Sequence, residues 1–176
     1  ALGISEAAWI GHSFGGKLVA EVAARQPDRV VYAVLLDPAM QLDVAVAGER
    51  AELTRADVSF ADADEAIDAR LNDGTLFTTP REMLVEEARE HLVESPDGRF
   101  RWQYSPAAAI VAWSEMASST PPWPRCPTLI VCGERSWIPI AVPRNGQITR
   151  VDVPGGHGVL WDDFDATADA IVQFLS

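Results

Sequence analysis

The chain has 176 residues, of which 48% are hydrophobic and 23% charged, the balance of an ordinary globular domain. Fourteen basic residues against twenty-six acidic ones give a net charge of −12, which makes nucleic acid and anionic membrane surfaces poor partners. No apolar run approaches the roughly 18 residues of a membrane span, and no charged-then-apolar leader precedes the first elements, so we expect a cytoplasmic protein.

The first predicted elements form a strand–helix–strand unit. Residues 7–10 form a short apolar segment that is followed at once by glycine, which predicts a buried strand of a parallel sheet. Across residues 14–26 apolar side chains recur at three- and four-residue spacing, which predicts a helix that Pro27 ends. Val30–Leu36 is uncharged and rich in β-branched residues, a second buried strand. The unit therefore predicts two parallel strands with a right-handed crossover.

Residues 39–122 differ in composition and predict a helical insertion. Acidic, alanine-rich stretches at 62–72 and 81–94 favour helices, and turn signals at Gly74 and Gly98 interrupt them. Such a segment is too long for a plain loop in a compact domain. We therefore expect a core at 1–38, an insertion at 39–122 and the rest of the core at 123–176.

The last region predicts two more buried strands and a closing helix. The strands are expected at residues 128–132 and at Ile148–Val153. An apolar stripe from Phe164 to Leu175 predicts the helix, with acidic residues in its first turn, where the helix dipole favours them. The predicted fold class is therefore α/β, with a parallel sheet covered by helices.

The two cysteines, Cys126 and Cys132, are not expected to pair. A nearly extended chain between them spans about 20 Å at ~3.3 Å per residue, whereas a disulfide needs Cα atoms within about 7 Å. We expect two buried thiols, which fits a reducing cytoplasm.

A nucleophile motif lies between the first strand and the first helix. Gly11-His12-Ser13-Phe14-Gly15 is a G-x-S-x-G sequence in the strand–turn–helix context that this motif requires. Ser13 is expected to be the nucleophile, held on a strained turn at the positive end of the helix. Side chains at Gly11 or Gly15 are expected to collide with neighbouring chain. The Phe14 N–H is expected to point toward the oxyanion of a tetrahedral intermediate.

A histidine in a glycine-rich loop is the candidate general base. His157 follows two glycines and precedes a third, between the fourth strand and the closing helix. We expect these glycines to let the loop bring the imidazole to Ser13, take its proton and deliver that proton to the leaving group. The side chain of His12 should leave the turn in another direction and serve structural support. His91, among charges on a helix, should be solvated.

No metal or cofactor is expected. The three histidines lack H-x-x-x-H spacing and the two cysteines lack a C-x-x-C. The glycine-rich turn around Ser13 lacks the Lys-Ser/Thr ending of a phosphate-binding loop.

Several short segments outside the insertion share a common pattern. They are the glycine-rich turn at 11–17, the link at 27–30, Leu36-Asp37-Pro38, the strand at 127–131 and Gly156-His157. Together they resemble the α/β-hydrolase superfamily, and the resemblance covers everything except the insertion. It implies a serine hydrolase, a helical cap at 39–122, and the chain order nucleophile, acid, histidine.

The acid departs from the superfamily's usual pattern. Relatives most often carry an Asp three residues after the glycine that ends the third strand, but Ser136 holds that place and cannot balance an imidazolium. Asp37, which ends the second strand on the same sheet edge as Ser13, is the favoured replacement, because some esterases of the superfamily place their acid there. Glu134 is the alternative acid. Asp37 before Pro38 is also a common turn-forming pair.

The resemblance further implies strands and helices that would precede residue 1 and carry the second oxyanion donor. We expect a missing N-terminal half, or a partner chain, to complete the sheet, because residues 7–10 would otherwise form an apolar open edge. Loss of one such donor typically lowers the rate by about 10²–10³.

Three tryptophans are expected to line the substrate pocket: Trp113 near the end of the insertion, and Trp137 and Trp161 beside the acid and histidine loops. They indicate a mostly apolar site for a small molecule. The leading interpretation is hydrolysis of a carboxylic ester or related acyl compound through a Ser13 acyl-enzyme. Carbon–carbon bond hydrolysis, lactone opening and a non-catalytic ligand-binding role remain open alternatives.

Overall fold

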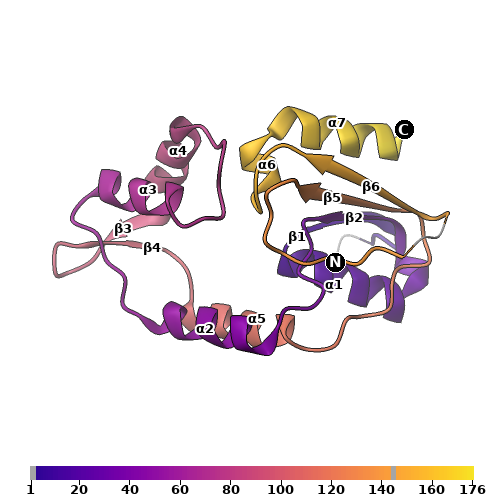
Figure 1. Cartoon of the computed structure of the whole chain (residues 1–176), viewed down its shortest axis with the longest axis horizontal. Helices are drawn as coiled ribbons and strands as arrows, with labels where there is room; N and C mark the ends of the chain where they lie inside the picture. Colours follow the sequence, from indigo (N-terminus) through magenta and orange to yellow (C-terminus); the bar gives the residue numbers. More distant parts are fainter. Residues whose placement is uncertain (1–2, 144–145) are drawn as a thin grey trace.

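Four parallel strands form the central sheet of the computed structural model, which describes residues 3–143 and 146–176 (Figure 1). The spatial order is β1-β2-β5-β6, and all three neighbouring pairs are parallel. The strands are β1 (Ala7–His12), β2 (Val30–Leu36), β5 (Thr128–Gly133) and β6 (Ile148–Val153). The prediction of an α/β fold with a parallel sheet is confirmed.

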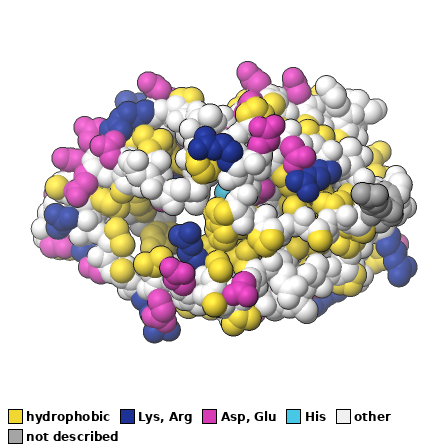
Figure 2. Space-filling view, in the orientation of Figure 1, with side chains coloured by type: hydrophobic (Ala, Val, Ile, Leu, Met, Phe, Trp, Pro, Cys, Tyr) yellow, Lys and Arg dark blue, Asp and Glu magenta, His cyan; other side chains and the backbone are white. Residues whose placement is uncertain are grey.

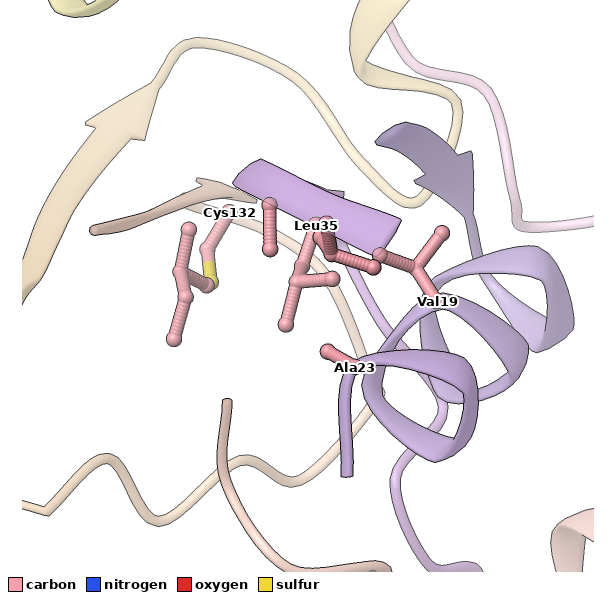
Figure 3. Packing of buried hydrophobic residues seen from close by; sticks show 7 residues of the cluster. Val19, Ala23, Leu35 and Cys132 are labelled. Carbon is pink, nitrogen blue, oxygen red and sulfur yellow. The ribbon is translucent and has the colours of Figure 1, made fainter. Parts of the chain in front are cut away.

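Helices cover both faces of this sheet (Figure 1). They are α1 (Phe14–Arg25), reached directly from β1, on one face, and α6 (Val159–Asp162) and α7 (Phe164–Leu175) on the other. Val19 and Ala23 of α1 point toward Leu35 and Cys132 of the sheet (Figure 3). On the opposite face Leu36 packs with residues of α6 and α7. Both faces of β2 are therefore buried, which explains its continuous apolar sequence.

β1 lies at one edge of the sheet, and within the described residues it pairs only with β2. Its Trp9 and Ile10 side chains stay 39% and 51% exposed. The apolar edge expected from the sequence is thus present in the described part of the chain. That further chain covers it stays a prediction.

The segment between β2 and β5 contains four helices and a two-stranded hairpin. These are α2 (Val44–Arg55), α3 (Ala63–Leu71), α4 (Arg81–His91), β3 (Leu92–Glu94), β4 (Phe100–Trp102) and α5 (Pro106–Met116). In Figure 1, α2 and α5 run side by side below the sheet, and α3, α4 and the hairpin stand apart from it at the left. Figure 1 also shows that the chain leaves and re-enters the sheet region through α2 and α5.

One predicted helix is shorter than expected. The helix predicted at residues 81–94 ends at His91, and Leu92–Glu94 forms β3 instead, paired antiparallel with β4. The cause is the turn that follows: Gly98 has φ +75°, and the Asp97 carboxylate accepts a hydrogen bond from the Arg99 N–H. A tight turn of this kind joins two strands and draws the preceding residues into the ladder.

Carboxylate and hydroxyl groups cap the starts of several helices. Asp43 caps α2, Asp62 caps α3, Ser105 caps α5 and Asp163 caps α7, each accepting at least one backbone N–H of the first turn. These caps satisfy donors that have no partner within the helix. They explain why acidic segments of this chain begin helices where they do.

Both cysteines are free thiols, Cys132 buried in β5 and Cys126 half-buried before it. None of the helices in the described part of the chain combines the length and hydrophobicity that a membrane crossing needs.

Candidate active site

Ser13 sits on a strained turn between β1 and α1. Its backbone has φ 54° and ψ −120°, a left-handed conformation that non-glycine residues rarely adopt. The Ser13 N–H donates to the Leu36 carbonyl at 2.9 Å, and the Ser13 carbonyl accepts from Gly16 and Ala39. These bonds hold the serine on the carboxyl edge of the sheet, at the N-terminus of α1.

A side chain at Gly11 would collide with neighbouring chain as predicted, but a side chain at Gly15 would not. A Cβ on Gly11 would lie 2.3 Å from the Gly15 carbonyl oxygen, so the expectation for Gly11 agrees with the geometry. The expectation for Gly15 is wrong, because a Cβ there would meet no atom within 4 Å. The second close approach is one residue later: a Cβ on Gly16 would lie 2.6 Å from the Pro38 Cβ. Gly16, not Gly15, is the residue of α1 that faces the segment after β2.

His157 reaches Ser13 from the loop after β6. The His157 Nε2 lies 2.9 Å from the Ser13 Oγ. The preceding glycines permit this path: Gly155 has φ +103°, and the Gly156 carbonyl oxygen passes so close to Gly133 that a Cβ on Gly133 would be 1.9 Å away. The loop is therefore packed tightly against the end of β5.

Asp37 completes the line of hydrogen bonds. Its Oδ2 lies 2.6 Å from the His157 Nδ1, and the residue is only 2% exposed. Asp37 also has a left-handed backbone, with φ 41°, at the end of β2. Because an ionised carboxylate only accepts, His157 Nδ1 is the donor in this pair, and Nε2 of the neutral ring is left to accept from the Ser13 hydroxyl.

The structure brings Asp37, and not Glu134, to the histidine. Glu134 is exposed, and its recorded hydrogen bond is from its own backbone N–H to Val153. Ser136, in the place where the resemblance implied an acid, donates its hydroxyl to Asp37 Oδ2 at 2.5 Å. The Gly133 N–H adds a longer bond to Asp37 Oδ1 at 3.4 Å. Ser136 therefore holds the Asp37 carboxylate in place by a hydrogen bond, although it carries no acid itself.

His12 lies closer to the site than expected. Its ring is 4.7 Å from the His157 ring, centroid to centroid, and it lines the same cavity as Ser13. Desolvation, and next the neighbouring His157, lower the pKa of His12, so the ring is neutral near pH 7. The neutral Nε2–H then donates to the His157 carbonyl oxygen at 2.7 Å. The prediction that this side chain points elsewhere is wrong, and its contact is with the histidine loop. His91, at the end of α4, is exposed as expected.

Phe14 is the first residue of α1, and its backbone N–H therefore has no intrahelical partner. Its half-buried side chain packs against the cluster that contains Ala39, Leu42 and Met116. The position is compatible with an oxyanion donor, which stays a prediction.

Asp162 is a buried carboxylate that sequence reasoning missed. It is 8% exposed and accepts hydrogen bonds from the Gly156 N–H, the Phe77 and Thr78 N–H groups and the Thr79 hydroxyl. Burial by itself would raise the pKa of Asp162, but these hydrogen bonds hold it below its usual value. One carboxylate thus joins the histidine loop to the segment before α4.

Lys17 makes a second such connection. It is 3% exposed, and its Nζ donates to the Glu115 and Ser118 carbonyls at the end of α5 and to the Ser118 hydroxyl. Burial lowers the pKa of Lys17, with Glu21 and Glu115 acting in the opposite direction. In the sequence, Lys17 and Asp162 are merely charged residues near the Ser13 turn and the His157 loop, and no motif predicts that they are buried.

A cavity of about 600 Å³ opens in front of Ser13 and His157. Trp113, Trp137 and Trp161 all line it, together with apolar residues such as Leu76 and Met116. Figure 2 shows the hollow near the centre of the molecule, with a histidine at its edge. The three tryptophans chosen from the sequence therefore share one cavity with the serine and the histidine.

Within residues 3–143 and 146–176, no group of three His, Cys, Asp or Glu side chains is arranged to hold a metal ion. Two hydrogen bonds join a hydroxyl, an imidazole and a carboxylate in one line, from Ser13 through His157 to Asp37.

Known proteins resemble this chain in sequence and fold. It is 39% identical to Lipase LipV of Mycobacterium tuberculosis (strain ATCC 25618 / H37Rv) over 108 residues, which are 61% of this chain and 41% of the lipase. The chain therefore spans less than half the length of this relative in the match.

Solved structures agree over nearly the whole chain. E-2-(Acetamidomethylene)succinate Hydrolase superposes with a TM-score of 0.73 at 23% identity, over 97% of this chain and 67% of that one. An alpha/beta hydrolase from Novosphingobium aromaticivorans DSM 12444 superposes with a TM-score of 0.72 at 20% identity, over 98% and 66%. At these identities the likeness is one of fold. The family model described as "Alpha/beta hydrolase family" matches residues 1–170, and the chain belongs to this family.

Proposed function

We propose that this chain carries the catalytic centre of a serine hydrolase that cleaves a carboxylic ester or a related acyl compound. The observation that carries the proposal is the line of hydrogen bonds from Ser13 Oγ through His157 to Asp37 at the wall of a mostly apolar cavity. Such a line can make a hydroxyl nucleophilic at neutral pH. The identity to a protein named as a lipase gives the proposal further support.

In the first half-reaction the Ser13 Oγ attacks the ester carbonyl carbon, and its proton passes to His157 Nε2. The new Oγ–C bond gives a tetrahedral intermediate whose oxyanion faces the Phe14 N–H. Asp37 accepts from Nδ1–H and stabilises the imidazolium. When the C–O bond to the alcohol breaks, Nε2–H gives its proton to the leaving oxygen, and an acyl-Ser13 ester remains.

In the second half-reaction a water molecule gives its proton to His157 Nε2 and attacks the acyl carbon. The Oγ–C bond breaks, the proton returns to Ser13, and the carboxylic acid leaves. Every proton that leaves an attacking oxygen is therefore returned to a leaving one, and the site is regenerated.

A fluorophosphonate probe, which phosphonylates activated serines, tests this proposal. We expect labelling at Ser13, identified by mass spectrometry of the Ser13 peptide, and loss of labelling and of p-nitrophenyl ester hydrolysis in Ser13→Ala. The expected loss in kcat is about 10⁴–10⁶-fold. Ser136→Ala is a useful comparison, because it retains the serine nucleophile while removing one bond to Asp37.

An unlabelled Ser13, or a Ser13→Ala protein with full activity, would contradict the proposal. Labelling of Ser13 with no turnover of esters of any chain length would overturn the ester assignment and favour lactone or carbon–carbon bond hydrolysis.

A further inference from the structure

The cavity in front of Ser13 contains a guanidinium that forms no ion pair with any residue in the described part of the chain. Arg50 projects from α2, and its Cζ lies 5.2 Å from the centroid of the Trp137 ring. Both residues line the same cavity as Ser13 and His157. Figure 2 shows basic side chains beside the central hollow. A cation is therefore held at the wall of the site in which the proposed chemistry takes place.

Arg70, a second arginine of this cavity, is different. Its Nη1 lies 2.7 Å from Asp73 Oδ2, and its Cζ lies 5.6 Å from the centroid of Trp161. Its charge is thus already balanced by a carboxylate that lines the same cavity. For Arg50, by contrast, no carboxylate in the described ranges 3–143 and 146–176 lies within ion-pair distance.

This lack of a partner is informative in a chain so rich in acids. The sequence has 26 acidic residues, and the same helix pairs Arg55 with Glu52 at 3.5 Å. A guanidinium against an indole face is held by the cation–π attraction, which leaves its N–H donors unused. Those donors form a planar fork that fits a carboxylate in two parallel hydrogen bonds.

We propose that the natural substrate is an acyl compound that carries a carboxylate, and that Arg50 binds this group while the ester carbonyl lies at Ser13. The inference rests on the proposed function and names its substrate class. Trp137 connects the two positions, since its ring is 6.3 Å from the His157 ring and also lies under Arg50. The apolar wall at Trp113 and Met116 contacts the carbon chain between them.

Matched pairs of esters test the inference. One pair places the charge on the acyl side: mono-p-nitrophenyl adipate, which keeps a free carboxylate, against methyl p-nitrophenyl adipate, in which that carboxylate is a neutral methyl ester. The other places it on the alcohol side: 4-acetoxybenzoate against 4-acetoxybenzamide. The readout is the ratio of kcat/KM for the charged ester to that for its neutral partner, and the pair with the higher ratio identifies the side of the substrate that Arg50 binds.

We expect the ratio for that pair to fall about 10- to 100-fold in Arg50→Met, the loss typical of a hydrogen-bonded charge pair. Arg50→Lys should retain part of it, because the charge stays but the fork is lost. Arg55→Met is the matched control, since Arg55 lies on the same helix, is 63% exposed and does not line the cavity. A ratio that Arg50→Met leaves unchanged for both pairs overturns the inference.

A binding measurement separates this inference from the proposed chemistry. In Ser13→Ala protein, monomethyl adipate should change the tryptophan fluorescence at concentrations where dimethyl adipate does not, and the added Arg50→Met change should abolish the difference. If the carboxylate binds through Arg50 but the protein with Ser13 hydrolyses no ester, the proposed function fails and the recognition stands. If neutral esters are cleaved and carboxylates show no dependence on Arg50, the recognition fails and the function stands.

Discussion

The sheet edge and the insertion line one cavity, and they differ in how deeply their residues are buried. Asp37 and His157 follow strands of a hydrogen-bonded ladder, and β2 and β5 are among the most buried parts of the chain. Helices α2 and α5 of the insertion bury little: in α2 the buried residue is Ala47, and in α5 it is Met116. The comparison indicates that Asp37 and His157 are positioned by the backbone of the sheet, whereas Arg50 and Trp113 are carried by the less deeply buried helices α2 and α5.

Two buried charged residues connect these regions. Lys17 ties α1 to the end of α5, and Asp162 ties the histidine loop to residues 77–79. Each satisfies backbone groups that apolar packing would leave without partners. Breaking either connection should affect the relation between the two regions more than the sheet itself.

Among variants that keep the Ser13 nucleophile, the largest expected effect is on the sheet edge, from Asp37→Asn. The amide cannot stabilise the imidazolium and favours the wrong tautomer of His157, so we expect kcat to fall roughly 10³–10⁴-fold. Glu134→Gln is the matched control and should keep full activity, because its exposed side chain takes no part in the line of hydrogen bonds. Steady-state kinetics on one p-nitrophenyl ester measures both. Full activity in Asp37→Asn together with loss in Glu134→Gln would reverse the assignment of the acid.

The next largest effect is expected on the free energy of unfolding, where alanine at Gly11 is compared with alanine at Gly15. Gly11→Ala places a methyl group 2.3 Å from the Gly15 carbonyl oxygen, a backbone atom that cannot move alone. We expect a loss of several kcal/mol in the free energy of unfolding, about 3 or more, and loss of labelling at Ser13. Gly15→Ala has open space and should change stability by less than about 1 kcal/mol. Urea unfolding of both variants measures the difference, and equal losses would disprove it.

Asp162→Asn tests the connection between the regions. The amide keeps the shape but loses charge-assisted hydrogen bonds, so we expect a loss of about 2–3 kcal/mol in the free energy of unfolding at pH 7. The exposed Asp165→Asn, in the first turn of α7, is the control and should cost less than about 0.5 kcal/mol.

The stability lost in Asp162→Asn is expected to depend on pH. The folded-state pKa of Asp162 lies below its usual value of 3.8, so the stabilisation is complete well above that value and is lost as pH falls through the folded-state pKa. The stability gap between the unsubstituted protein and Asp162→Asn should therefore be full at pH 7 and narrow below about pH 4. A gap that widens on acidification would contradict this role.

The smallest effect is expected within the insertion, from Gly48→Ala. Gly48 lies in the middle of α2, and a Cβ there would meet no atom within 4 Å. Alanine should therefore stabilise the protein by about 0.5–1 kcal/mol through helix propensity and a less flexible unfolded chain. A rise in Tm without change in kcat/KM is the expected result. A loss of activity would show that α2 must flex for substrate to bind.

Local patterns in the sequence are sufficient for much of this molecule. Strands β2 and β5 and helices α1 and α7 follow from apolar runs and helical spacing, because each buries a face that its own residues define. Strands β1 and β6 lie at the predicted positions, but the prediction that they are buried is wrong, because each pairs on one side only in the described part of the chain. The serine motif and the glycine loop around His157 are likewise local, since their backbone conformations depend on glycines a few residues away. The end of α4 does not follow from local sequence, because pairing with β4 overrides a helical pattern there.

Only the tertiary structure decided the contacts between distant segments. Asp37 is 120 residues from His157 in sequence, and the choice between it and Glu134 depends on which strand end faces the imidazole. The close approach at Gly16, the support from Ser136 and the position of Arg50 over Trp137 likewise need two segments to be packed together. Sequence spacing describes one segment at a time, whereas distances between strand ends and helices are set by the packing of the whole domain.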